Sequence, residues 1–274
     1  MDATGRLNKS KYDCLLFDMD DTLYPMSLGV NYACRKNIEE YMLKYLKIEE
    51  SEVPGMCLDL YREYGTTMAG LKFLGYEFDN DEFHEYVHGR LPYDTLNPDS
   101  VLRNLLLSMP QRKIIFTNAD KAHAAKVLTK LGLEDCFEGI ICFETLNPPL
   151  EQDNYNNVAD IDMDDPFESA KSLILGPLIL CKPSVEAIEA AIRVANIDPK
   201  KTIFFDDSAR NIASGKTAGL YTVIVGSSVL VPGADFALGS IHNIKEALPE
   251  IWDGEDDQLE QIIQPATVEA VVIA

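Results

Sequence analysis

The sequence has little that would place it in a membrane or in an oxidising compartment. Its six cysteines include no C-x-x-C pair, so neither a zinc site nor a disulfide framework is indicated. It has no apolar run of membrane-spanning length, and its polar beginning, MDATGRLNKSKYD, lacks the apolar core of a signal peptide. We therefore expect a cytoplasmic protein without a membrane partner.

Basic residues are also scarce. The 274 residues include 24 Lys and Arg against 45 Asp and Glu, which gives a formal net charge of -21. Nucleic acids attract surfaces rich in Lys and Arg, so we expect no nucleic-acid partner. A small phosphate ligand remains compatible with this charge, because a bound cation can reverse the electrostatic field within a site. The sequence carries no signal of the oligomeric state.

Short apolar runs alternate with helical patterns along most of the chain. The runs that predict strands are CLLF from Cys14, KIIFT from Lys113, GIICF from Gly139, TIFF from Thr202 and YTVIV from Tyr221. They are too continuously apolar for half-exposed strands, so helices should cover both faces of the sheet. Helical patterns include KAHAAKVLTKLG, which should end at Gly132, and SVEAIEAAIRVAN. This alternation predicts an α/β fold with a Rossmann-like parallel sheet.

Residues 26–96 break the alternation, because every pattern there is helical. We predict that they form a small all-helical cap inserted after the first strand, and that residues 1–25 and 97–253 form the catalytic core. A cap at this point suggests a lid over the end of the first strand, whereas helices that only pack on the core would leave the site open. Residues 148–170 are acidic and aperiodic and are predicted to form a flexible insertion. Residues 254–274 form a tail to which we assign no role.

Polar side chains follow several predicted strands at the points where those strands end. They are Asp18, Asp20, Thr117, Asn118, Asp206 and Asp207, together with Lys182 just before a helix. Each alone has an ordinary role as a helix cap or a turn residue. Ligands of open parallel sheets bind beyond the carboxyl ends of the strands, however, so the set together predicts one catalytic crevice.

The residue types in this set indicate phosphoryl chemistry. Asp18 and Asp207, with a backbone carbonyl near Asp20, supply hard oxygen ligands suited to Mg²⁺. A metal there would offset the repulsion between the carboxylates and hold a phosphate beside Asp18 for in-line attack. The groups that would contact phosphate oxygens are Lys182, the Thr117 hydroxyl and the Asn118 amide. Asp20 would protonate the departing alkoxide and later activate water, which predicts hydrolysis of a phosphomonoester.

Four short motifs carry a resemblance to a known family. DMDDT, TN, CKP and DDSARN resemble, in order and in strand context, the motifs of the haloacid dehalogenase superfamily of phosphatases. The resemblance implies that Asp18 is a nucleophile that forms an aspartyl-phosphate, and that Asp20 is the general acid and base. It also implies that Thr117 and Lys182 bind phosphate and that Asp207 binds the metal.

The same resemblance extends to three further residues. It implies that Asp206 is associated with the metal, directly or through water, and that Met19 is among the substrate-binding residues. Asn211 departs from the pattern, because many members have a second acidic residue there, and this puts a metal role for Asn211 in doubt. The dehalogenating branch lacks the second aspartate of the first motif, here Asp20, so dehalogenation is disfavoured.

Longer stretches resemble one branch of this superfamily. FDMDDTLYP, YGTTMAGL from Tyr64 and HGRLPYDTLNPD from His88 are similar to the pyrimidine 5′-nucleotidase-like branch, and most of all to its plant members that dephosphorylate xanthosine 5′-monophosphate (XMP) in purine catabolism. The resemblance implies a nucleoside-monophosphate substrate, with XMP first and UMP or CMP as the alternative. A small sugar phosphate, a phosphomutase reaction and a catalytically idle regulatory scaffold remain open alternatives.

Within the cap, the stretch YGTTMAGLK is polar and bounded by glycines, and it interrupts apolar helices. We predict that Tyr64, Thr67 and Lys72 from this stretch contact the base of the substrate. His84 and His88 lie four residues apart on an expected helix, a spacing that we interpret as a solvated face.

Overall fold

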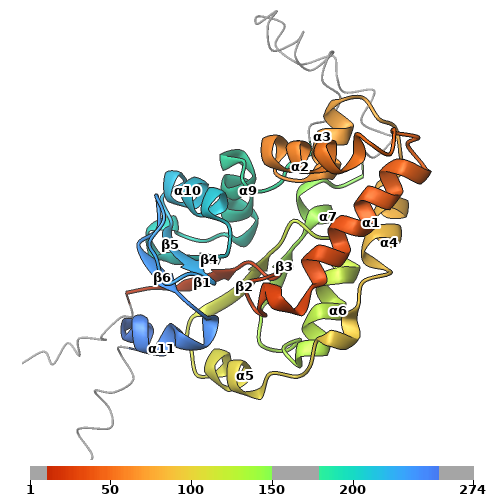
Figure 1. The fold of residues 1–274 in the computed structure, drawn as a ribbon. Coiled ribbons are helices and arrows are strands. Elements are labelled where there is room, and N and C mark those ends of the chain that lie inside the picture. Colours follow the sequence, from red (N-terminus) through yellow and green to blue (C-terminus); the bar gives the residue numbers. More distant parts are fainter. Residues whose placement is uncertain (1–10, 150–178, 253–274) are drawn as a thin grey trace, which may run out of the picture.

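The computed structural model describes residues 11–149 and 179–252. Six parallel strands form one sheet in the order β3-β2-β1-β4-β5-β6 (Figure 1). The strands are β1 (Cys14–Phe17), β2 (Arg112–Phe116), β3 (Gly139–Ile141), β4 (Thr202–Asp206), β5 (Tyr221–Val225) and β6 (Phe236–Leu238). Strand β1 lies in the middle, paired with β2 and β4. The predicted α/β fold with a parallel sheet is confirmed.

Two strands differ from the sequence prediction by more than a single residue at an end. The GIICF run is a strand only as far as Ile141, because Cys142 is the N-cap of the short helix α7 (Phe143–Leu146). Strand β6 lies outside the predicted set. It has only three residues, and Phe236 and Ala237 are only partly buried, so its apolar signal is weak.

Helices cover both faces of the sheet, which is why the strand sequences are continuously apolar. The helices around the sheet are α5 (Ser100–Leu107), α6 (Lys121–Leu131), α9 (Val185–Ala195), α10 (Ala209–Thr217) and α11 (Ile244–Ala247). Leu15 and Phe17 of β1 enter one core, which α5, α6 and α11 also line. Cys14 and Leu16 point the other way, into a core shared with α9 and α10. Alternate side chains of one strand therefore fill two different cores.

The helix that follows β2 begins and ends at residues with a clear local cause. Asp120 is the N-cap of α6, and its carboxylate accepts a hydrogen bond from the backbone N–H of His123 at 2.9 Å. Gly132 ends the helix in the left-handed conformation with a φ of 67°. The predicted C-terminus of this helix is confirmed. Its first turn lies directly after β2, next to the end of β1.

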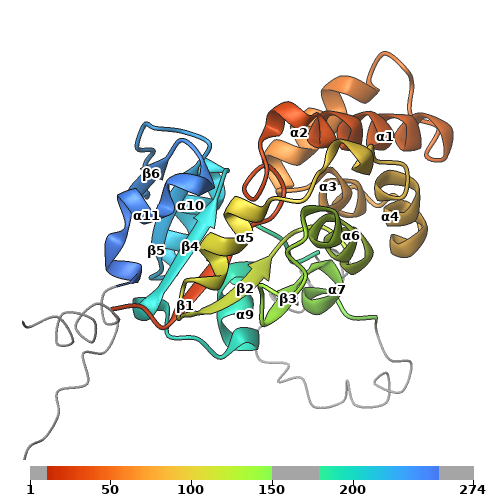
Figure 2. The same ribbon diagram turned by 90° about the horizontal axis from the view of Figure 1, so that it is seen from below.

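Between β1 and α5, the described chain contains helices and no strand. They are α1 (Val30–Lys44), α2 (Val53–Tyr64), α3 (Thr67–Phe73) and α4 (Asn80–His88), with short 3₁₀ turns at Met26–Leu28 and Tyr93–Thr95. These helices share a core of their own, which includes Met42, Leu60 and Phe83. Figures 1 and 2 show them gathered on one side of the sheet. We refer to α1 to α4 as the cap helices; the exact division between cap and core stays a prediction.

Two predicted segments fall largely outside the described ranges. The insertion at 148–170 is described only at Pro148 and Pro149, and the tail at 254–274 is not described.

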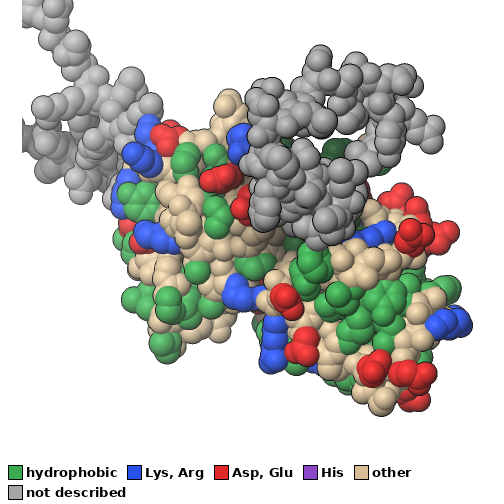
Figure 3. Space-filling model, turned by 90° about the horizontal axis from the view of Figure 1, so that it is seen from above, with side chains coloured by type: hydrophobic (Ala, Val, Ile, Leu, Met, Phe, Trp, Pro, Cys, Tyr) green, Lys and Arg blue, Asp and Glu red, His purple; other side chains and the backbone are tan. Residues whose placement is uncertain are grey.

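The surface shown in Figure 3 carries acidic, basic and hydrophobic side chains that are interspersed, so charges of one sign do not gather there in one large patch. Within the described ranges, no helix combines the length and the apolarity needed to cross a bilayer.

Candidate active site

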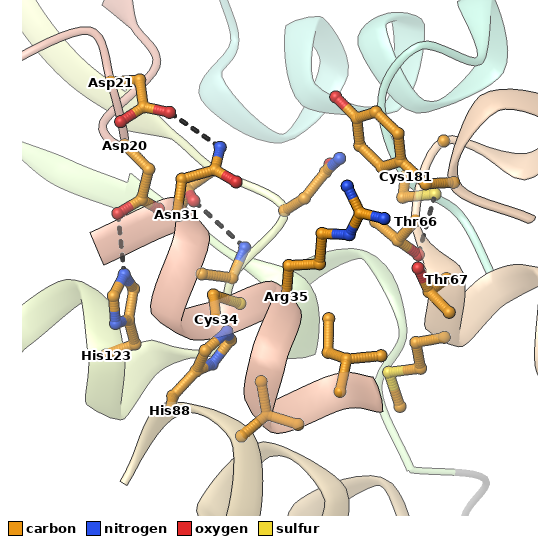
Figure 4. Close-up of a pocket in the computed structure, with 18 of the residues that line it drawn as sticks. Asp20, Asp21, Asn31, Cys34, Arg35, Thr66, Thr67, His88, His123 and Cys181 are labelled. Carbon is orange, nitrogen blue, oxygen red and sulfur yellow. Dashed lines mark hydrogen bonds and ion pairs between the residues drawn. The ribbon is translucent and has the colours of Figure 1, made fainter. Parts of the chain in front are cut away.

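A cavity of about 470 Å³ lies between the carboxyl ends of the strands and the cap helices (Figure 4). From the core, its lining includes Asp18, Asp20, Thr117, Asn118, Lys182 and Asp207. All four cap helices contribute the opposite side. The structure thus brings six of the predicted core residues to one cavity, because the parallel strands β1, β2 and β4 end at the same edge of the sheet.

The cap lies close to the core where α2 and α3 meet. Gly65 lies there with a φ of 88°, and a Cβ atom at this position would lie 2.4 Å from the carbonyl oxygen of Lys182. Any larger residue would therefore push the cap away from the segment that carries the lysine.

Asp18 follows β1 and is held from three sides. Its backbone N–H donates to the carbonyl of Phe205 at 2.8 Å, which continues the pairing of β1 with β4. Its Oδ1 accepts a hydrogen bond from Lys182 Nζ at 2.7 Å, and its Oδ2 accepts one from the Thr22 hydroxyl at 2.8 Å. Burial raises the pKa of the Asp18 carboxyl above its ordinary value, although Lys182 opposes the shift. These contacts fix the orientation of the carboxylate, but the positive charge of Lys182 does not fully offset the cost of burying its negative charge.

Lys182 is the main cation of the core side. It is 1% exposed, and its three N–H groups donate to Asp18 Oδ1 at 2.7 Å, Asp206 Oδ2 at 2.8 Å and the Phe116 carbonyl at 2.7 Å. Burial alone would lower the pKa of Lys182, but Asp18 and Asp206 outweigh it and raise the pKa. The ammonium group therefore keeps its charge despite complete burial.

Asp206 and Asn211 support this lysine. Asp206 is fully buried, and its Oδ1 accepts from the backbone N–H of Ser208 at 2.8 Å. The Asn211 amide donates to both oxygens of Asp206, at 3.0 and 3.1 Å. With these donors and Lys182 in place, both oxygens of Asp206 already have partners. This arrangement gives Asn211 a role in orienting the Asp206 carboxylate, and whether Asp206 would hold a metal directly or through water stays a prediction.

The carboxylates fit a divalent cation. Asp18, Asp206 and Asp207 each offer one oxygen atom, and these atoms lie within 4.8 Å of one another. Asp207 has no hydrogen-bond partner in the described parts of the chain, and burial together with Asp18 and Asp206 raises its pKa to about 8. Three carboxylates face one ammonium group, so the site holds excess negative charge that a hard cation bound through oxygen would neutralise.

Asp20 is held by two residues, one of which the sequence analysis did not identify. Its Oδ1 accepts a hydrogen bond from the Tyr24 hydroxyl at 2.5 Å and contacts His123 Nε2 at 2.8 Å (Figure 4). Burial would raise the pKa of Asp20, but the charge and the hydrogen bond of His123, and then Tyr24, outweigh it and lower the pKa. Tyr24 and His123 thus both contact the same oxygen, Oδ1. The other oxygen, Oδ2, is left without a partner among the described residues.

The hydrogen-bond pattern around His123 sets which of its nitrogens carries a proton. The Tyr93 hydroxyl donates its one hydrogen to the His88 carbonyl at 3.0 Å. Its oxygen therefore accepts from His123 Nδ1, which lies 2.8 Å away. With a hydrogen on Nδ1, the contact between His123 Nε2 and Asp20 requires one further proton, which the two side chains share. The His123 pKa is raised accordingly, because Asp20 outweighs the effect of burial.

The two histidines of α4 do not form a solvated face, so that interpretation is wrong. His84 is 7% exposed, and His88 Nδ1 bonds to Asp120 Oδ2, which connects the cap to the N-terminus of α6. Both line the cavity. The spacing of four residues correctly places them on one face of a helix, but the sequence pattern does not say that this face is turned inward.

The predicted phosphate-binding residues on β2 take different positions. The Thr117 hydroxyl accepts from the backbone N–H of Ala119 at 3.0 Å, and among the described residues its own hydrogen has no acceptor, so it can donate into the cavity. Asn118 instead clamps the backbone of Lys182: its amide donates to the Lys182 carbonyl at 2.9 Å, and its oxygen accepts from the Lys182 N–H at 2.8 Å. Asn118 therefore positions the lysine through two of its hydrogen-bonding groups. Its amide has a second N–H group and lines the cavity, so its role as a phosphate donor stays a prediction.

Of the other predicted substrate contacts, only Thr67 lines the cavity, and its hydroxyl donates to the Cys57 carbonyl at 3.0 Å. Tyr64 and Lys72 are not among the described lining residues: the Tyr64 ring packs on Phe73, and the Lys72 ammonium group bonds to the Phe78 carbonyl. Met19 is fully buried in the core of the sheet, so its side chain does not reach the cavity.

Comparison with known proteins identifies the family. The model of the haloacid dehalogenase-like hydrolases matches residues 12–219. The chain belongs to this family. Curated relatives include Phosphate metabolism protein 8 of Saccharomyces cerevisiae, 25% identical over 217 residues, and Glyceraldehyde 3-phosphate phosphatase of Pyrococcus furiosus, 26% identical over 211 residues. Each alignment covers 76% of this chain, and they cover 60% and 78% of the two relatives. The match thus spans less than two thirds of the yeast protein.

Solved structures share the fold of this haloacid dehalogenase-like hydrolase. CbbY of Rhodobacter sphaeroides, in complex with phosphate, has a TM-score of 0.55 at 15% identity, with 88% of this chain and 99% of that chain covered. YfnB of Bacillus subtilis, bound to magnesium, has a TM-score of 0.50 at 19% identity, with 86% and 97% covered. The name of the Pyrococcus relative assigns a phosphatase activity to that protein.

Proposed function

We propose that this hydrolase is a Mg²⁺-dependent phosphatase of nucleoside 5′-monophosphates, with XMP as the first candidate substrate and UMP or CMP as the next. The observation that carries the proposal is the continuity of the cavity, which joins the carboxylates and Lys182 to a largely apolar space under the cap. Its volume of about 470 Å³ is in the range of pockets that enclose a whole small-molecule ligand. A ribose and a flat base would fill this space better than a triose would. The preference for xanthine rests on the sequence resemblance.

The residues support a reaction in two halves. In the first, Asp18 attacks phosphorus, the ester P–O bond breaks, and Asp20 gives a proton to the leaving oxygen through the oxygen that Tyr24 and His123 leave free. In the second, Asp20 takes a proton from water as the water oxygen attacks the aspartyl-phosphate, which releases inorganic phosphate and restores Asp18. Lys182 orients Asp18 throughout. A magnesium ion held by Asp18, Asp207 and a backbone carbonyl near Asp20 would neutralise charge on the phosphate.

A small sugar phosphate is the second candidate substrate. It is favoured by the Pyrococcus furiosus relative, whose name assigns it glyceraldehyde 3-phosphate. The carboxylates, Lys182 and Thr117 would treat both classes alike, because they face only the phosphate group. The lining of the cap therefore has to decide between the two classes.

The test is phosphate release in the presence of Mg²⁺ from XMP, GMP, IMP, AMP, UMP, CMP, ribose 5-phosphate and glyceraldehyde 3-phosphate. We expect the highest kcat/KM for a nucleoside monophosphate, with XMP first. A higher value for either sugar phosphate would refute the nucleotidase proposal. Transfer of phosphate to substrate instead of water would indicate a phosphomutase. Release from none of them would favour the idle scaffold, and Asp18→Asn, which removes the nucleophile, provides the inactive reference.

A further inference from the structure

The cavity has a cap half, formed by its lining residues between positions 24 and 91, and this half is mostly apolar. Its apolar lining residues include Val30, Ile38, Leu58, Met68, Phe83 and Val87. Such a surface favours burial of a flat or aliphatic group but does not select one polar pattern over another. Selection between substrates of similar size therefore has to come from the few polar side chains among these residues.

Most of these polar side chains already have protein partners. Thr67 donates its hydroxyl to a backbone carbonyl, His88 bonds to Asp120, and the Asn31 amide donates to Asp21 at 2.7 Å. Arg35 also extends into the cavity, as Figure 4 shows, and donates its Nε to Glu39 at 3.0 Å. The Arg35 side chain is 43% exposed, so water satisfies its remaining N–H groups and it does not require a ligand.

His84 differs from these four residues. It is 7% exposed and lines the cavity, and in the described parts of the chain neither of its ring nitrogens has a hydrogen-bond partner. The ring is fixed in place by other rings. It stands edge-on to Phe143 at a centroid distance of 4.6 Å and lies parallel to His88 at 5.5 Å. A polar ring is thus held rigidly at the wall of an apolar space with its hydrogen-bonding capacity unused.

The surroundings of His84 also fix its charge. Burial, and then the neighbouring His88, lower the pKa of His84 to about 4. At neutral pH the ring is therefore uncharged, with one N–H donor and one nitrogen acceptor. A neutral ring does not attract a second phosphate group, but it can pair with an uncharged group such as a carbonyl or a ring N–H. A buried polar group without a partner destabilises the complex with any ligand that fails to supply one.

We propose that His84 is a specificity-determining residue, which selects a leaving group that carries an uncharged hydrogen-bonding edge, as a nucleobase does, over one that is only apolar. This inference rests on the proposed phosphatase function and deepens it. The Tyr64 and Lys72 side chains, predicted from the sequence for this task, do not reach the cavity lining, whereas His84 does.

The experiment measures kcat/KM of His84→Leu and His84→Asn on two substrates. One is the nucleoside monophosphate that the wild type prefers, and the other is phenyl phosphate, whose leaving group has no carbonyl and no N–H. We expect His84→Leu to lose about 5- to 150-fold more on the nucleotide than on phenyl phosphate, the range for a polar group left unpaired. His84→Asn keeps a donor and an acceptor, so it should lose less. His242→Leu is the matched control, because His242 is a half-exposed histidine that bonds to Asp99 and does not line the cavity.

Equal losses on both substrates, or no loss on either, would overturn the assignment of His84. If His84→Leu does not fold, the comparison of His84→Asn with wild type decides on the same criterion. The substrate panel of the wild type judges the proposed function separately. If a sugar phosphate proves to be the best substrate, the nucleotidase proposal fails, and the same ratio taken with that sugar phosphate decides for or against His84. An enzyme that hydrolyses nothing in the panel would overturn both.

Discussion

Replacing His123 by phenylalanine removes one of the two contacts to Asp20 Oδ1 and keeps an aromatic ring beside His88 and Tyr93. The wild-type ring lies 4.6 Å from that of His88 and 5.6 Å from that of Tyr93. The substitution therefore keeps most of the packing and removes the shared proton. Tyr24 remains as a single donor to the carboxylate, at 2.5 Å.

The expected magnitude follows from the type of bond that is lost. A hydrogen bond to a charged group contributes about 1.5–3 kcal/mol, which corresponds to about 10- to 150-fold in rate where the transition state depends on it. Asp20 must deliver a proton only when the leaving oxygen is a poor leaving group. The full loss in kcat/KM is therefore expected for an alkyl phosphate such as ribose 5-phosphate, and a much smaller one for p-nitrophenyl phosphate.

The assay compares kcat/KM for these two esters, because this quantity covers only the steps up to formation of the aspartyl-phosphate. His123→Gln retains an N–H group that can reach Asp20 and should recover part of the alkyl phosphate activity. His242→Phe is the control for introducing phenylalanine at a histidine outside the cavity. Equal losses on both esters, or a His123→Gln variant no better than His123→Phe, would refute the role of His123 in positioning Asp20.

Three further predictions concern charge in the cavity. Lys182→Met leaves Asp18 buried without its cation. We therefore expect loss of phosphate release and, in denaturant unfolding, a free energy of unfolding lower by about 3–5 kcal/mol. An unchanged free energy of unfolding would contradict the stabilising role of this buried ion pair. Asp207→Asn removes a carboxylate that has no hydrogen-bond partner among the described residues. Without Mg²⁺ the variant should therefore melt at a higher temperature than the wild type, and added Mg²⁺ should raise its melting temperature less. Equal Mg²⁺-induced shifts in the two proteins would count against a metal role for Asp207. The folded-state pKa of His84 is lowered to about 4 from an ordinary 6.5, so the unfolded chain binds more protons between these values. The contribution of His84 to the free energy of unfolding is thus fully present above about pH 6.5 and falls by about 3 kcal/mol as the pH drops to about 4. When the free energy of unfolding is measured against pH, this fall should be missing in His84→Leu.

The sequence was sufficient where a signal is local. The apolar runs of β1, β2, β4 and β5 predict buried parallel strands, because a strand covered on both faces needs apolar side chains at every position. The end of α6 at Gly132 is equally local, since a left-handed residue stops a helix wherever it stands. Strand β6 was missed because it has only three residues, two of them partly buried, which carry too little pattern.

The catalytic set could also be anticipated, because parallel strands deliver the residues at their carboxyl ends to one edge. Asp18, Thr117 and Asp207 needed only the strand assignment and this rule to be placed together. What the rule does not give is the partner of each side chain. Asn118 follows β2 as predicted, yet its amide bonds to the backbone of Lys182, 64 positions away in the chain.

The cap shows what only the tertiary structure decided. Helical spacing puts His84 and His88 on one face, but which face turns inward depends on how α4 packs against α1 and against Phe143. The role of His123 was likewise not readable from the sequence. Its place in the first turn of α6 carries no signal of a contact with Asp20. It reaches Asp20 only because α6 starts beside the end of β1. By itself, the sequence determined the elements and the chemistry available at the strand ends. The orientation of each helix, and with it the set of side chains that meet in the cavity, was decided by packing between residues far apart in the chain.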